Sequence, residues 1–177
     1  MGHETATRDD YLPEADALEQ STDFRFLYDY LVDQVTPGCL PGRQHIEPAD
    51  LTKVLTAINL VDYSPEEDGF RLRYRLVGSL QTHFFSNDKN VTGQYLDEFW
   101  ELNPHLKPMI LDDYLRAIRR RGPSIGIYER PNEDFPFLGY ARMVFPLAGD
   151  GREIDMFIVL HAYRDPRTNE FSSRISA

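Results

Sequence analysis

Cysteine is almost absent from this sequence, and long apolar runs are missing altogether. The single cysteine, Cys39, cannot form an internal disulfide, and no cysteine and histidine spacing matches a structural zinc site. The N-terminus has no basic flank followed by an apolar stretch, so it does not resemble a secretion signal. No later run reaches the roughly 20 apolar residues that cross a bilayer. We therefore expect a cytoplasmic protein with no membrane partner.

Positive charge is also scarce, with 19 lysines and arginines against 29 acids and a net charge of −10. The resulting field repels phosphate backbones, so nucleic acid is not an expected partner. Catalytic signatures are missing too: there is no Gly-rich phosphate loop, nucleophile elbow or paired-histidine metal motif. Asp112-Asp113 and Asp97-Glu98 are adjacent pairs whose side chains diverge on a helix, so neither predicts a catalytic dyad. We expect no enzyme activity and no metal site.

The length of 177 residues, 41% of them hydrophobic, fits one compact domain with flanking segments. Residues 1–23 hold seven acids and one base and are expected to form an acidic N-terminal arm. A helix with one buried face is expected next, because apolar residues recur with the helical period. Thr22 or Asp23 is suited to cap this helix, and Pro37-Gly38 to stop it. Its apolar stripe consists of Phe24, Leu27, Tyr28, Leu31, Val32 and Val35.

Five strand-like segments are expected after a short helix at 48–55, and they cover residues 58–63, 70–77, 124–130, 137–147 and 153–163. A longer helix between the second and third begins at Asn103-Pro104 or Lys107-Pro108 and ends at Gly122-Pro123. In 70–77, Phe70, Leu72, Tyr74 and Leu76 alternate with arginines, which predicts one buried and one polar face. Turn residues at 64–69 and 149–151 predict hairpins. Hairpin-linked strands around a helical stretch predict an antiparallel sheet with helices on one face, an α+β fold.

Several short segments in this order resemble the PAS domain superfamily, and within it the bacterial single-domain PAS proteins of the fifth PAS-fold family. They are Arg-Tyr-Arg-Leu-Val-Gly at 73–78, the short helical stretch 79–85, Val-Thr-Gly-Gln-Tyr-Leu at 91–96 and the segment 145–155, with a further match at 40–51. The resemblance covers residues 24–165 and leaves 166–177 as a C-terminal tail. It implies a PAS fold: a five-stranded antiparallel sheet with short helices and one longer helix on one face, preceded by N-terminal helices.

The resemblance also implies a cup that holds haem, flavin, another small molecule or only side chains, so the cofactor is unknown. Cys39 precedes the first strand and is misplaced for a flavin photosensor that needs a cysteine beside the ring. Haem would need an axial histidine from His83, His105 or His161, although an ordinary hydrogen-bonded histidine is the simpler reading. Amphipathic rings and one guanidinium suit a small ligand with an acid or carbonyl group. The ligand-binding candidates are Tyr74, His83, Phe84, Tyr95, Tyr114, Tyr140, Arg142 and His161.

Two alternatives stay open for these residues. The tyrosines can simply fill the core while Arg142 lies exposed on the other face of the sheet. Four arginines at the end of the longer helix are suited either to bind an anion or to complement the helix dipole as a solvated end. They are Arg116, Arg119, Arg120 and Arg121.

We expect a PAS-type sensor domain that binds a small molecule or a protein partner and acts in trans, because the sequence contains no effector module. A homodimer through the helix from Phe24 to Val35 is expected, unless that stripe covers its own sheet. One rival is a small cone-shaped α+β enzyme resembling ketosteroid isomerases, for which Asp155 and His161 are the nearest acid and base. The other is a ligand-free structural adaptor.

Overall fold

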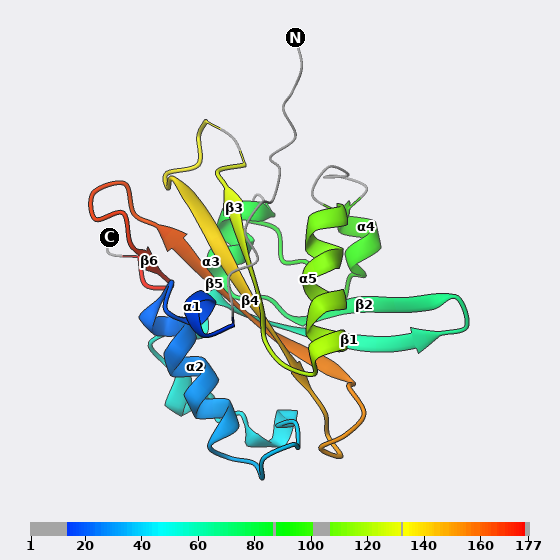
Figure 1. Cartoon of the computed structure of the whole chain (residues 1–177). Coiled ribbons are helices and arrows are strands. Elements are labelled where there is room, and N and C mark those ends of the chain that lie inside the picture. Colours follow the sequence, from blue (N-terminus) through cyan, green and yellow to red (C-terminus); the bar gives the residue numbers. More distant parts are fainter. Residues whose placement is uncertain (1–13, 87, 101–106, 132, 176–177) are drawn as a thin grey trace.

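The computed structural model describes residues 14–86, 88–100, 107–131 and 133–175, and an open antiparallel sheet forms its centre (Figure 1). The sheet order is β2-β1-β5-β4-β3, and β6 pairs with β5. The C-terminal strands therefore fold back beside the first hairpin, as an α+β fold with an antiparallel sheet requires, and this prediction is confirmed. The strands are β1 (Ile58–Glu66), β2 (Gly69–Leu76), β3 (Ser124–Glu129), β4 (Gly139–Leu147), β5 (Met156–Arg164) and β6 (Phe171–Ser172).

Helices cover both faces of this sheet, so the expectation of helices on one face is wrong: the N-terminal helices pack on the face opposite the later ones. On one face lie α1 (Glu14–Leu18), α2 (Thr22–Val32) and three short 3₁₀ turns, Arg43–His45, Pro48–Leu51 and Leu55–Ala57. On the other face lie α3 (Ser79–Phe85), α4 (Leu96–Trp100) and α5 (Lys107–Arg120). We call the first the outer face and the second the inner face. Successive residues of β4 and β5 point alternately to the outer and the inner face. Because helices cover both faces, every residue of β4 is buried.

The apolar stripe of α2 packs on the outer face of its own sheet. Phe24, Leu27 and Leu31 have no exposed surface and share one core cluster with Met143 and Phe145 of β4. The alternative that the stripe covers its own sheet therefore holds for these three side chains, and a homodimer would need other residues.

The start of α2 differs from the expected cap. Ser21, rather than Thr22 or Asp23, is the N-cap, and its hydroxyl accepts a hydrogen bond from the Asp23 amide at 3.2 Å. Residues 1–13 of the predicted acidic arm lie outside the described residues. From Glu14 onward the arm belongs to the fold, because Leu18 and Asp23 are buried.

The predicted C-terminal tail also joins the sheet in part. Tyr163 and Arg164 of β5 pair with Ser172 and Phe171 of β6, an element that the sequence pattern did not predict. The Asp23 carboxylate accepts hydrogen bonds from the amide and the hydroxyl of Ser173 at 2.9 and 2.7 Å. The start of α2 and the end of the chain thus lie against each other.

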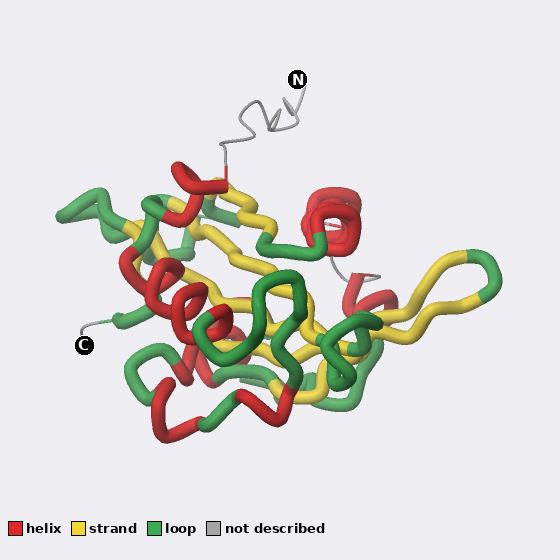
Figure 2. Tube along the Cα trace, turned by 60° about the horizontal axis from the view of Figure 1, so that its bottom comes forward, coloured by secondary structure: helices red, strands yellow, loops and turns green. Residues whose placement is uncertain are grey.

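The first hairpin departs from the predicted alternation at one residue. Leu76 was expected in the core but is 39% exposed, because a bulge between Leu60 and Val61 shifts the register. Across it Leu60 faces Leu76 and Val61 faces Tyr74, so these two residues of β2 point to opposite faces. The turn itself is short, since the strands reach Glu66 and Gly69, and the hairpin projects from the rest of the sheet (Figure 2). None of the helices in the described segments has the length and apolarity needed to cross a membrane.

Candidate functional site

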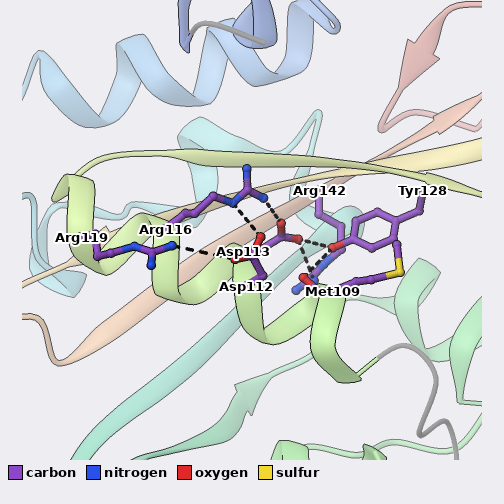
Figure 3. Close-up of polar contacts among 7 residues, drawn as sticks. All are labelled: Met109, Asp112, Asp113, Arg116, Arg119, Tyr128 and Arg142. Carbon is purple, nitrogen blue, oxygen red and sulfur yellow. Dashed lines mark hydrogen bonds and ion pairs between the residues drawn. The ribbon is translucent and has the colours of Figure 1, made fainter. Parts of the chain in front are cut away.

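Arg142 lies near the middle of the inner face, on the central part of β4. Its neighbours Ala141 and Met143 pack in the outer core, so the alternation of the strand turns Arg142 toward α5. Only 6% of the residue is exposed. Its Nη1 donates to Asp113 Oδ2 at 3.4 Å (Figure 3). Its Nη2 donates to the Tyr114 hydroxyl, also at 3.4 Å. The alternative that Arg142 is exposed on the other face of the sheet is wrong.

Asp113 is the carboxylate at the centre of this cluster. It is completely buried, whereas the side chain of its neighbour Asp112 is 32% exposed, because adjacent helix positions diverge. The Asp113 carboxylate accepts hydrogen bonds from Arg116 Nη2 at 2.5 Å, from the Tyr128 hydroxyl and from Arg142 (Figure 3). These donors come from α5, β3 and β4, so the carboxylate ties the long helix to the sheet.

Four tyrosines surround this charged pair. Tyr74 comes from β2, Tyr114 from α5, Tyr128 from β3 and Tyr140 from β4, and each is buried. Burial raises the pKa of all four hydroxyls, that of Tyr140 to about 12, although the nearby positive charge of Arg142 opposes the rise. The rings of Tyr128 and Tyr140 stack with centroids 4.9 Å apart. The surroundings of Arg142 are therefore neutral at physiological pH, apart from Asp113.

His161 stands directly across the β4–β5 ladder from Arg142. It is 2% exposed, and its Nδ1 lies 3.4 Å from the carbonyl oxygen of Ala57. Burial, reinforced by the positive charge of Arg142, lowers the His161 pKa to about 3. The imidazole is consequently neutral at physiological pH.

Five of the eight predicted ligand-binding residues lie together, namely Arg142 and four residues around its guanidinium. The five are Tyr74, Tyr114, Tyr140, Arg142 and His161. Asp113 and Tyr128 complete the cluster and were not among the candidates. The helical period does place Asp113 on the same side of α5 as Tyr114 and Ala117, which predicts burial. The sequence does not show that its partners lie on β3 and β4, so it could not identify Asp113 as a site residue.

The other three candidates lie elsewhere. His83 is exposed on α3, where its Nδ1 is 2.9 Å from Asp88 Oδ1. Phe84 packs against the far side of the aromatic cluster that also contains Tyr128 and Tyr140, with its ring centroid 5.3 Å from that of Tyr163. Tyr95 stacks with Arg71, whose guanidinium carbon lies 3.5 Å from the centroid of the Tyr95 ring.

The residues considered for haem and for catalysis are also dispersed. His105 lies outside the described residues. Asp155 is exposed at the β4–β5 connection, where it accepts a hydrogen bond from the Gly149 amide at 2.9 Å, so it is not part of the inner-face cluster. Cys39 is exposed ahead of β1. No group of three or more metal-binding side chains occurs within the described ranges.

The balance of charge in the cluster leaves Arg142 only partly neutralised. Asp113 is shared between Arg142 and Arg116, and Arg116 also pairs with Asp112 at 3.2 Å. A guanidinium has five N–H donors, and the two hydrogen bonds that Arg142 makes with the described part of the chain are both 3.4 Å long. The site therefore retains the capacity to donate to a carbonyl or carboxylate oxygen.

No protein-family model matches the chain, and neither the curated proteins nor the solved structures include one with significant similarity to it.

Proposed function

We propose that this chain is a PAS-type sensor domain that binds a small molecule with a carboxylate or carbonyl group beside Arg142. The fold supports the proposal in its arrangement. The C-terminal strands lie beside the first hairpin, and α3, α4 and α5 cover the same face, as the resemblance to PAS domains implies. Such a domain would pass its signal to a separate protein.

The buried, partly satisfied guanidinium of Arg142 is the observation that carries the proposal. Burying a charge is unfavourable unless the charge is well paired, and here the pairing consists of two contacts of 3.4 Å. A ligand carboxylate would add short, charge-assisted hydrogen bonds. The hydroxyls of Tyr74, Tyr114 and Tyr140 stay protonated, so they are able to donate to the same ligand.

An enzymatic role is less well supported by the same residues. Three donors already engage the Asp113 carboxylate, so it fixes the arginine rather than taking a proton from a substrate. The His161 pKa of about 3 makes the imidazole a weak base at neutral pH. We therefore propose a binding domain and not an enzyme of the ketosteroid isomerase kind.

Native mass spectrometry of the purified protein, before and after denaturation, tests whether a small molecule is retained, and absorbance above 300 nm reports a chromophore. For ligand-free protein, benzoate and succinate are added in a thermal melt, with benzyl alcohol as the control that has neither a carboxylate nor a carbonyl group. At 100 times the dissociation constant a ligand stabilises the fold by about 2.7 kcal/mol. For a chain of this size that raises the melting temperature by roughly 5 to 11 °C.

The variant Arg142→Lys should abolish this stabilisation, because a lysine cannot bind a carboxylate in the bidentate geometry. Tyr114→Phe keeps the guanidinium and removes one hydroxyl, so it should weaken the response without unfolding the domain. Tyr163→Phe is the matched control, because the buried Tyr163 hydroxyl has no hydrogen-bond partner among the residues that the structure describes. No retained molecule, together with no carboxylate-specific shift, would favour the structural adaptor and end the proposal.

A further inference from the structure

A half-open groove lies at the C-terminal end of α2, away from the Arg142 cluster. Its walls are α2, the segment 35–41 that follows it, the turn after α5 and Phe145 of β4. The volume is about 670 Å³, within the range of small-molecule sites, roughly 300 to 1,000 Å³. Phe145 belongs to the outer core whereas Arg142 lies on the inner face, and Arg142 is not part of the groove lining, so the two sites are distinct.

One wall of the groove is apolar and another is cationic. Tyr28, Val32 and Val35 are half-buried along the first wall. Arg120 and Arg121 are exposed on the second, and the lining includes no aspartate or glutamate. The contrast is informative, because the whole chain carries 29 acids against 19 bases. A locally positive groove in an acidic protein selects for an anion.

The two arginines differ in how far they are engaged by the protein. Arg121 Nη2 donates to the carbonyl oxygen of Arg152 at 2.6 Å, which holds its side chain at the rim. Arg120 makes no ion pair or hydrogen bond with any part of the chain that the structure describes, so its guanidinium is available. If these arginines only complemented the dipole of α5, no apolar wall opposite them would be needed, so the apolar wall favours the alternative that they bind an anion.

We propose that this groove binds a small amphipathic carboxylate, with the carboxylate between Arg120 and Arg121 and the apolar body along Val32 and Val35. The volume favours a small molecule as the occupant, since about 670 Å³ lies within the range of small-molecule sites. The proposal does not depend on a ligand at Arg142.

Cys39 provides a site-specific readout, because it is the only cysteine of the sequence and lies exposed in the groove lining. The rate of its alkylation by N-ethylmaleimide is measured on the full chain at one fixed pH. Octanoate is the probe, octan-1-ol supplies the same tail without the charge, and acetate supplies the charge without the tail. We expect octanoate to slow alkylation several-fold and saturably, and the two controls to have much weaker effects.

The double variant Arg120→Ala/Arg121→Ala should bind octanoate about tenfold or more weakly, as expected for the loss of charge-assisted hydrogen bonds. Arg130→Ala removes an exposed arginine outside the groove and should behave like the wild type. Arg120→Ala alone guards against a folding defect, because Arg120 makes no bond whose loss would destabilise the chain. Tyr114→Phe, in the other site, should leave the protection of Cys39 unchanged.

Three results would overturn the proposal. They are equal protection by octanoate and octan-1-ol, full protection by acetate, and protection that survives the double arginine variant. A loss of Cys39 protection in Tyr114→Phe would also contradict it, because that variant alters only the inner-face site.

Discussion

Neutralising Asp113 should destabilise the protein far more than neutralising its neighbour Asp112. In Asp113→Asn the buried Arg142 loses the one carboxylate that it contacts, and Arg116 loses its shorter contact. Removing one partner of a buried ion pair typically costs about 3 to 5 kcal/mol, because the other charge stays buried. Asp112→Asn is the matched control, because the Asp112 side chain is 32% exposed and its partner Arg116 keeps the contact with Asp113, so the change should cost clearly less.

Urea unfolding followed by far-UV circular dichroism measures both variants, with the same denaturant dependence expected for each. The melting temperature of Asp113→Asn should fall by roughly 6 to 20 °C, at 2 to 4 °C for each kcal/mol in a chain of this size. A double variant, Asp113→Asn/Arg142→Met, removes both charges and should cost less than the two single changes together. If Asp113→Asn and Asp112→Asn lose the same stability, then Asp113 does not hold Arg142 in the way described.

Three further predictions concern other parts of the fold. The folded state binds a proton at His161 only near pH 3, whereas an unfolded histidine binds one near pH 6.5, so the free energy of unfolding should fall by about 1.4 kcal/mol per pH unit as the pH drops below about 6. His161→Leu should flatten that dependence in urea titrations between pH 5 and 7, and an unchanged slope would contradict it. Asp23→Ala leaves the Ser173 amide and hydroxyl without their acceptor, so it should lower the free energy of unfolding by about 1 to 3 kcal/mol. It should also speed amide hydrogen exchange in β6, and unaltered exchange there would count against a link between the start of α2 and β6. Leu76→Thr should change stability by less than about 0.5 kcal/mol, whereas Leu72→Thr, at a buried position, should cost more than about 2 kcal/mol, and similar costs would refute the bulge.

The strand pattern carried most of the fold because alternation reports burial directly. All five predicted strands occur within a few residues of their expected bounds. Leu76 escaped the pattern because a single bulged residue reverses the faces beyond it, and nothing in the local composition marks the bulge. β6 escaped because two residues are too short to show a period.

The site was harder to predict because its residues come from five elements, β2, α5, β3, β4 and β5. Tyr74, Tyr114, Tyr140 and Arg142 were sensible candidates as amphipathic side chains at buried positions. His83 and His161 are both histidines, so residue type alone could not tell which one is buried. His83 is exposed on α3, whereas His161 is buried on β5. Spacing within a helix or strand predicts which side chains share one side of that element. Which of these sides then contact one another depends on how the elements pack, and spacing does not report that.

The burial of both faces explains why the sequence of β4 left the direction of the Arg142 side chain open. A strand with one wet face shows polar residues at every second position, but all nine residues of β4 are buried, so Arg142 has only apolar and aromatic neighbours in the sequence. Placing a guanidinium there does not serve stability by itself, since apolar replacements of buried ion pairs are often neutral or stabilising. The ligand that we propose would complete the hydrogen bonding of Arg142 and so account for a buried charge that packing alone does not require.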